Sequence, residues 1–448
     1  MLKRLTRLYH SFALTNRTYF LLAVIVALFI ISFFIPSLYS VALIGLWVLC
    51  VTVLLDALVL YAKAKGFSAE RNTADRFSNG DQNLIQLQLR NHYTFRVKAA
   101  IIDELPVQFQ QTKAVFSSTL KGGEEQEHTY SLKPMQRGEY AFGAINVFIT
   151  SPLKLVERRY SIEAQQTIPT YPSFQQLKRY QLMALSSRLN ETGSRRLRKL
   201  GSSTEFEQIK EYITGDDYKK VNWKATARKG DIMVNTFTDE KSQHIYCLID
   251  KGRNMKMPFE GMTLLDYAIN ASLVLTNIAL LKHDKAGLLT FASKPESFLP
   301  ADRKGMQMEL ILENLYRQET HFSETDFEAL YAHVHGKIKN RSLLILFTNF
   351  ESIHGFQRQL PYLRRIARSH LLLIVFFENT ELKTLREKRA ENLEDIYIKT
   401  IADKFAFEKK LIVKELQQHG ILSVLTTPQQ LTVNTINKYI ELKARQAI

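Results

Sequence analysis

One feature constrains this chain more than any other: residues 18–55 contain no Asp, Glu, Lys or Arg. As a single helix these 38 residues would be roughly 57 Å long, about twice the ~30 Å thickness of the hydrocarbon core of a bilayer. Pro36 lies near the middle of the run, and proline removes a helix donor and clashes with the preceding turn. The run therefore predicts a hairpin of two transmembrane helices, near Tyr19–Ile35 and Leu38–Tyr61.

Basic residues flank the predicted hairpin on both sides: Lys3, Arg4, Arg7 and Arg17 precede it, and Lys63 and Lys65 follow it. Because positive flanks stay in the cytoplasm, we expect a multi-pass protein whose two termini are both cytoplasmic. A cleaved signal peptide is the alternative, but it would leave the second apolar run unexplained. Asp56 lies inside the second span, where we expect interfacial placement or pairing with Arg17 in preference to a proton path.

The formal net charge of +16 would attract anionic lipid headgroups or nucleic acid. A basic cluster, Arg195, Arg196, Arg198 and Lys199, has no aromatic residues between its charges, whereas a groove for nucleic acid would interleave them. We therefore expect membrane lipid as the partner of this charge and no nucleic acid. The two cysteines, Cys50 and Cys247, fall in a span and in a predicted buried strand, which suits a reducing compartment.

After the hairpin domain, residues 1–66, the pattern changes to that of short strands. Apolar and polar residues alternate from Leu84 to Arg90, which is the period of a half-buried strand. Further candidate strands, separated by glycine turns, are Val97–Ile102, Glu127–Leu132, Tyr140–Ile149 and Leu155–Tyr160. Residues 67–170 are therefore predicted to form a small all-β sandwich.

Residues 171–240 are predicted to be a linker and a motif-bearing segment, and residues 241–448 an α/β domain. Five apolar runs, typical of strands buried on both faces, are Ile245–Ile249, Ala286–Phe291, Leu343–Phe347, Leu371–Phe377 and Ile421–Leu425. Helical patterns between them cover Leu264–Leu281, Lys304–Arg317, Phe327–Ile338, Gln357–Arg368 and Lys409–Gln418. This alternation predicts a Rossmann-type parallel sheet with helices on both faces. Ligands of such sheets lie at the carboxyl ends of the strands, next to Asp250 and Asn349.

The stretch from Asp250 to Asn254 resembles the metal loop of von Willebrand factor A domains, Asp-x-Ser-x-Ser. The positions that match its ligands are Asp250, Asn254, Thr325 and Asn349. Gly252 stands where the first Ser would be and offers no oxygen. The resemblance implies a von Willebrand A-like fold. Magnesium prefers a complete shell of hard oxygen ligands, so we expect a loop that no longer holds an ion, with weak magnesium binding as the alternative.

A second set of motifs precedes that domain. It consists of Glu205-Phe206, Glu211-Tyr212, Gly215-Asp216-Asp217 and Asn222-Trp223-Lys224, with Arg228 after them. This order closely resembles the signature of the bacterial domain of unknown function 58 family, whose members combine two spans, a β-domain, the signature and a von Willebrand A-like domain. The resemblance implies a location in the bacterial inner (cytoplasmic) membrane and partnership with an AAA+ ATPase of the MoxR type.

The signature places both signs of charge close together, so it can be an ion-pair network or a catalytic constellation. It contains no Ser or Cys nucleophile paired with His, and we expect a structural lock that docks the segment on the sheet domain. The expected function is a non-enzymatic, cytoplasm-facing interaction module without a cofactor, an adaptor for the ATPase. The alternatives are a membrane-associated hydrolase that uses the acids of residues 205–217, and metal-dependent ligand binding at the Asp250 loop.

Overall fold

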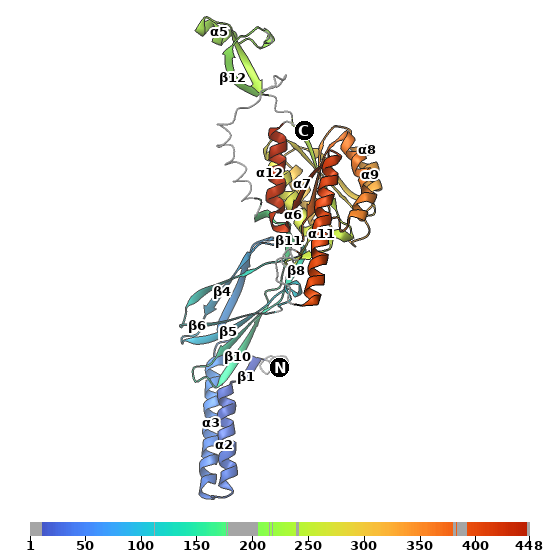
Figure 1. Cartoon of the computed structure of the whole chain (residues 1–448). Coiled ribbons are helices and arrows are strands. Elements are labelled where there is room, and N and C mark those ends of the chain that lie inside the picture. The colour runs from blue at the N-terminus through green and yellow to red at the C-terminus, as the bar shows by residue number, and fades with distance from the viewer. Residues whose placement is uncertain are drawn as a thin grey trace. The chain divides into compact units, whose positions relative to one another are not determined.

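The computed structural model describes residues 11–111, 113–175, 177, 205–214, 216, 218–238, 242–379, 382 and 392–445. It divides into two compact units, Met1–Tyr171 and Pro172–Ile448, and each is described by itself (Figure 1). The basic cluster of residues 195–199 lies outside the described residues. So do Gly215 and Asp217 of the signature, and Lys3, Arg4 and Arg7 before the first helix.

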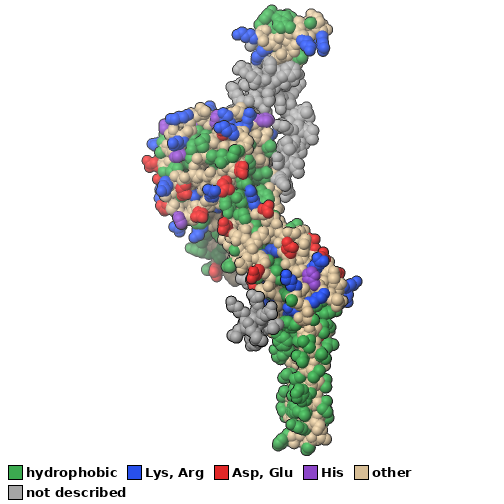
Figure 2. Space-filling model, turned by 180° about the vertical axis from the view of Figure 1, so that it is seen from behind, with side chains coloured by type: hydrophobic (Ala, Val, Ile, Leu, Met, Phe, Trp, Pro, Cys, Tyr) green, Lys and Arg blue, Asp and Glu red, His purple; other side chains and the backbone are tan. Residues whose placement is uncertain are grey.

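The first unit begins with two long apolar helices, α2 (Asn16–Ser32) and α3 (Ser37–Tyr61), close to the bounds predicted from sequence. Helix α3 is long and apolar enough to cross a membrane, whereas α2 is shorter, at 17 residues. Figure 2 shows a surface of hydrophobic side chains along this helical hairpin. A third apolar helix, α6 (Leu264–Leu281), passes the same length test, but 78% of its apolar window is buried, as in the core helix of a soluble domain.

Eleven described strands complete the first unit: β1 (Phe12–Leu14), β2 (Phe67–Thr73), β3 (Phe77–Ser78), β4 (Asn83–Asn91), β5 (Val97–Glu104), β6 (Lys113–Leu120), β7 (Glu125–Leu132), β8 (Gly138–Phe142), β9 (Ile145–Thr150), β10 (Val156–Ile162) and β11 (Gln166–Tyr171). They form sheets of order β1-β10-β9-β5-β6, β2-β4-β7 and β3-β11-β8. Apolar residues of β2 and β4 share one core with those of β5 and β9, so the first two sheets pack face to face.

The alternation along β4 is as predicted: Ile85, Leu87 and Leu89 are buried while the residues between them are exposed. The predicted strand Tyr140–Ile149 is instead two strands, β8 and β9. The break between them is held by Glu104, whose carbonyl accepts from the Gly143 amide and whose carboxylate accepts from the Ala144 amide at 3.0 Å. A local sequence pattern does not reveal a break that a distant side chain imposes.

Helix α3 ends inside the core of the β-sandwich. Leu60 is fully buried, and its carbonyl accepts from the Tyr93 hydroxyl (2.8 Å) and from Arg158 Nη1 (2.6 Å). One turn earlier, Asp56 is 2% exposed. Its carboxylate accepts from the backbone amides of Leu153 (3.3 Å) and Leu155 (3.2 Å) and from the Ser151 hydroxyl.

The structure thus gives Asp56 partners other than Arg17, which was one of the two placements expected from sequence. From the side of α2, the Thr18 hydroxyl donates to the Leu155 carbonyl at 2.5 Å. Both helices therefore make hydrogen bonds to the same turn, residues 151–155. These contacts join the helical hairpin to the sandwich.

The second unit is built on a six-stranded sheet of order β18-β17-β14-β19-β20-β21. Its strands are β14 (His244–Asp250), β17 (Lys285–Phe291), β18 (Pro295–Asp302), β19 (Leu343–Phe347), β20 (Leu371–Phe377) and β21 (Leu422–Thr426). All neighbours are parallel except β18, an antiparallel edge strand. A small hairpin, β15 (Pro258–Phe259) and β16 (Met262–Thr263), precedes α6.

Helices cover both faces of this sheet. One core lies under α6, α7 (Gln307–Tyr316) and α12 (Leu431–Ala444), and the other under α8 (Phe327–Lys337), α9 (Ile353–Ser369) and α11 (Leu393–Gln418). The C-terminal region is therefore α/β, as predicted. Strand β18 and helix α12 were not predicted, and α11 begins at Leu393, not at Lys409.

Candidate functional site

Polar side chains gather at the carboxyl edge of the sheet where β14 and β19 lie side by side. From β14 the chain adds β17 and β18 on one flank, and then β19, β20 and β21 on the other. In doubly wound sheets, ligands bind where the strand order reverses in this way. Asp250 is the last residue of β14, and Thr348 and Asn349 follow β19 directly.

The carboxylate of Asp250 lies at this edge, and the residue is 1% exposed. Its Oδ1 accepts from the Gly252 amide (2.8 Å) and the Thr325 hydroxyl (2.7 Å), and its Oδ2 accepts from the Thr348 hydroxyl (2.7 Å). Burial raises the pKa of Asp250, and these three donors partly oppose the shift. The carboxylate thus acts as an internal acceptor that ties two loops to the sheet.

Gly252 is the residue that permits this closure. A Cβ at position 252 would lie 1.8 Å from Thr325 Oγ1, so a serine there would collide with the hydroxyl that donates to Asp250. The absence of a side-chain oxygen at position 252 is therefore what allows Thr325 to reach Asp250.

The other two predicted ligands, Asn254 and Asn349, bind each other. Asn254 Nδ2 donates to the Asn349 carbonyl at 3.1 Å, and Asn349 Oδ1 accepts from Lys409 Nζ at 2.6 Å. An ammonium at that distance takes the place that a cation would occupy at this oxygen. Among the described residues, no group of three or more His, Cys, Asp or Glu side chains is placed to hold a metal ion.

Burial lowers the pKa of Lys409 to about 8, and the charge of Glu351 opposes the shift. The unfolded chain then binds more protons than the folded one between about pH 8 and the ordinary lysine pKa of 10.5, so the free energy of unfolding rises with pH across that window.

We expect the α/β unit to gain about 2–3 kcal/mol of stability between about pH 7 and about pH 10, as measured by urea unfolding. A Lys409→Met variant should lack this gain. An equal gain in the variant would show that another group is responsible.

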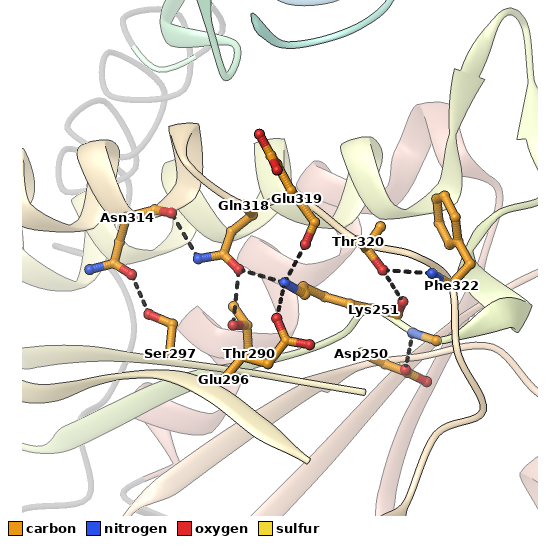
Figure 3. A network of polar contacts seen from close by, with 11 residues as sticks. Asp250, Lys251, Thr290, Glu296, Ser297, Asn314, Gln318, Glu319, Thr320 and Phe322 are labelled. Atoms are coloured by element: carbon orange, nitrogen blue, oxygen red, sulfur yellow. Dashed lines mark hydrogen bonds and ion pairs between the residues drawn. The ribbon is translucent and has the colours of Figure 1, made fainter. Parts of the chain in front are cut away.

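A second buried network lies beside Asp250 (Figure 3). The ammonium of Lys251, which is fully buried, pairs with Glu296 and donates to Gln318 Oε1 (3.1 Å) and to the Glu319 carbonyl (2.6 Å). The Thr320 hydroxyl donates to the Lys251 carbonyl at 2.7 Å. The loop after α7 is thereby held across the end of β14.

The signature forms a hairpin of its own. Strand β12 (Glu205–Glu211) pairs with β13 (Met233–Thr238), and a 3-10 turn (Tyr218–Lys220) and helix α5 (Trp223–Lys229) lie between them. Asn222 caps α5 by accepting from the Ala225 amide at 3.0 Å, and its Nδ2 donates to Asn235 on β13 at 2.8 Å. Glu205 and Phe206 lie on β12, and their side chains are outside the described part of the structure.

Two acids of the signature, Glu211 and Asp216, are paired within the hairpin. Lys210 Nζ and the Ile213 amide donate to Asp216 at 2.8 and 3.0 Å, and the pKa of Asp216 is lowered by these contacts. Glu211 pairs with Lys229, which lowers its pKa as well. A carboxyl with a lowered pKa is unsuited to act as a general acid near neutral pH. These ion pairs connect residues within the hairpin. Docking of the hairpin on the sheet domain stays a prediction.

Several large apolar side chains of this hairpin are exposed. Trp223 is 69% exposed, and Ile213 and Tyr218 are nearly as exposed. Of the hairpin side chains that the structure describes, only Met233 and Val234 are buried. Lys224 and Arg228 are exposed beside Trp223, and Figure 2 shows basic and hydrophobic side chains together on the hairpin.

The structure brings Asp250 together with Thr325, and Asn254 together with Asn349. The sequence analysis did not name Thr348 or Lys409 as members of the site. Thr348 could have been predicted, because it directly precedes Asn349 at the end of an apolar run. Lys409 comes from a helix 60 residues further along, and no local signal marks it.

The fold and the site define a protein with a two-helix apolar hairpin, a β-rich unit and a doubly wound α/β unit with a closed polar edge. The family model described as protein of unknown function DUF58 matches residues 208–395. The uncharacterized protein YeaD of Bacillus subtilis (strain 168) is 27% identical over 123 residues, which are 28% of this chain. The chain spans only 30% of the length of that relative.

Solved structures resemble the chain only over short stretches. The CARDB domain of PF1109 from Pyrococcus furiosus is 15% identical, with 24% of this chain and 93% of that one covered and a TM-score of 0.17. The PapD-like domain 7 of human CEP192 is 18% identical, with 23% and 86% covered and a TM-score of 0.18. Neither likeness carries an argument about this protein.

Proposed function

We propose that this chain is a membrane-anchored docking protein that binds a partner protein through the hairpin of residues 205–238. The observation that carries the proposal is the exposure of Ile213, Tyr218 and Trp223 on a hairpin in which few of the described side chains are buried. Large aromatic residues beside Arg are the composition of interface hot spots. The lysines and arginine around them favour a partner with an acidic rim.

The partner we propose is an AAA+ ATPase of the MoxR type. This part of the proposal rests on the resemblance of residues 205–228 to the domain of unknown function 58 signature, supported by the family match over residues 208–395, and is an argument by analogy. We also propose a von Willebrand A-like class for the α/β unit, on the basis of its strand order and the Asp250 loop. The closed edge of the sheet then serves as a rigid support for docking and not as a metal-dependent receptor.

The anchor in this proposal is the helical hairpin α2–α3, which would span the bacterial inner membrane with both of its ends in the cytoplasm. Its support is the apolar, largely exposed surface of the two helices and the basic residues on either flank. Membrane lipid is accordingly a second partner.

Replacement of Trp223 by alanine should weaken binding to the purified MoxR-type ATPase of the same organism. Loss of an exposed aromatic hot spot removes about 2–4 kcal/mol of binding free energy, or roughly 30-fold to 1000-fold in affinity. Binding would be measured by biolayer interferometry with the full chain in detergent.

Leu84→Ala is the matched control, because Leu84 on β4 has a similar exposure to Trp223 but lies in the β-sandwich. It should leave affinity unchanged. Equal affinities for the wild type, Trp223→Ala and Leu84→Ala would remove the hairpin from the interface, and no binding by the wild type would remove this ATPase as the partner.

A further inference from the structure

The amino edge of the six-stranded sheet, where its parallel strands begin, is strongly basic on the side of α8 and α9. These two helices lie side by side (Figure 1). Both end at this edge, because β19 begins at Leu343 and β20 at Leu371, just beyond their last residues. Six exposed cations, named the basic edge from here on, lie near the two helix ends: Lys337, Lys339, Arg341, Arg364, Arg365 and Arg368.

Contacts within the fold hold the two parts of the basic edge together. The Leu371 amide, at the start of β20, donates at 3.0 Å to the carbonyl of Ser342, the residue that follows Arg341. Between the helices, the guanidinium of Arg365 on α9 lies over the ring of Tyr331 on α8, 5.7 Å from its centre. The six cations therefore belong to one surface.

Most of this positive charge is unopposed within the described part of the fold. Residues 329–377 contain one acid, Glu351, and it follows β19 at the opposite edge of the sheet. None of the six cations forms an ion pair with an acid among the described residues. Helix C-termini attract cations, but each carries only about half a negative charge, so the two helix ends offset about one of the six positive charges.

The position of the basic edge indicates what it binds. Strand β13 of the hairpin ends at Thr238, and β14 begins at His244, at the same edge of the sheet as the start of β19. The six residue steps from Thr238 to His244 span at most about 21 Å, so the hairpin stays tethered to this edge. The hairpin exposes Lys224 and Arg228 beside Trp223. Two basic surfaces joined by so short a tether favour one acidic partner.

The aromatic residues of this surface argue against nucleic acid as that partner. A groove for single strands offers exposed rings on which bases stack. Tyr331 and Tyr362 are instead half-buried, and the guanidinium of Arg365 lies over both rings. The rings are thus already engaged by a cation of the chain itself.

We propose that the basic edge binds an acidic surface of the same partner protein that docks on the hairpin of residues 205–238. The inference rests on the proposed function, because it assigns both contacts to one partner. In this arrangement the hairpin supplies the apolar hot spot. The basic edge attracts the partner and orients it along the edge of the sheet.

The test compares charge-reversal variants of the full chain in detergent, with binding to the purified MoxR-type ATPase measured by biolayer interferometry. Arg364→Glu/Arg368→Glu should weaken affinity roughly tenfold to a hundredfold at low salt, mostly through slower association, and added salt should shrink this loss. Lys98→Glu/Lys133→Glu is the matched control, because it changes the net charge equally at two exposed lysines of the β-sandwich. The control should keep wild-type affinity, and both variants should keep the wild-type unfolding curve in urea.

The same measurements separate this inference from the proposed function. If Trp223→Ala loses affinity and Arg364→Glu/Arg368→Glu does not, the basic edge is overturned and the hairpin remains. The reverse pattern upholds the basic edge and overturns the hairpin.

A wild type that does not bind the ATPase overturns that partner, and a fluorescein-labelled oligoglutamate peptide then tests the basic edge by fluorescence anisotropy. The wild type and the control should bind the peptide roughly tenfold more tightly than Arg364→Glu/Arg368→Glu. Equal affinities would overturn the proposal. Tighter binding of a DNA duplex or of phosphatidylglycerol nanodiscs, lost in the same variant, would also overturn it, because the basic edge would then recognise phosphate groups and not an acidic protein.

Discussion

Replacement of Asp56 by alanine should loosen the attachment of the helical hairpin to the β-sandwich. The side chain is buried and accepts from Ser151 and from the amides of Leu153 and Leu155. Without the carboxylate these buried donors lose their acceptor, which costs roughly 3–5 kcal/mol. Amide hydrogen exchange of residues 151–156 in detergent-solubilised protein should accelerate roughly a hundredfold or more.

Two comparisons sharpen this expectation. Peptides covering β14 in the α/β unit serve as an internal control, and their exchange should not change. Asp56→Asn should resemble Asp56→Ala, because Oδ1 and Oδ2 each accept from a backbone amide, and an amide nitrogen at either position would face another donor. Wild-type exchange rates in both variants would show that the carboxylate does not hold the turn.

The pattern of the apolar runs was sufficient to predict the helical hairpin, most strands of the sheet and both of its helical layers. The reason is physical: spans and doubly covered strands must be apolar along their whole length, so their signal is local. Strand β18 was missed because an edge strand with one exposed face has a mixed pattern, Pro295–Asp302. The start of α11 was missed because the first half of this helix does not pack on a core cluster of the sheet. Its sequence therefore lacks the amphipathic pattern from which a helix is predicted.

The candidate site was only partly accessible from sequence. Asp250 could be recognised as a polar residue after an apolar run. The close approach of Thr325 Oγ1 to Gly252 could not, because these two residues are far apart in the chain. In the same way, Asp56 finds its partners 95 or more residues later. The sign of a buried charge can be read from sequence, whereas the partner that satisfies it requires the fold.

The buried carboxylates of Asp56 and Asp250 should respond differently to the same substitution. Both are acceptors for three donors, but the donors differ. Asp250 Oδ2 accepts only from the Thr348 hydroxyl among its described contacts. A hydroxyl can rotate and accept a hydrogen bond in place of donating one. Asp56 has a backbone amide at each oxygen, and an amide cannot reverse.

Replacement of Asp250 by alanine should therefore lower the free energy of unfolding of the α/β unit by about 3 kcal/mol, because it leaves three buried donors unpaired. Asp250→Asn should stay within about 1 kcal/mol of the wild type, because its oxygen replaces Oδ1 and its nitrogen donates to Thr348. Urea unfolding followed by fluorescence measures both.

Comparison of the wild type with Asp250→Asn separates a structural role of Asp250 from a metal-binding one. Burial raises the pKa of Asp250, so wild-type stability should fall as pH rises through that pKa, and Asp250→Asn should lose this dependence. A carboxylate that bound magnesium would instead make the wild type more stable when magnesium is added, and the Asn variant would not respond. We expect equal unfolding curves with and without magnesium for both proteins, since Lys409 already supplies the cation at Asn349. A magnesium-dependent shift in the wild type alone would show that the edge of the sheet opens to admit an ion.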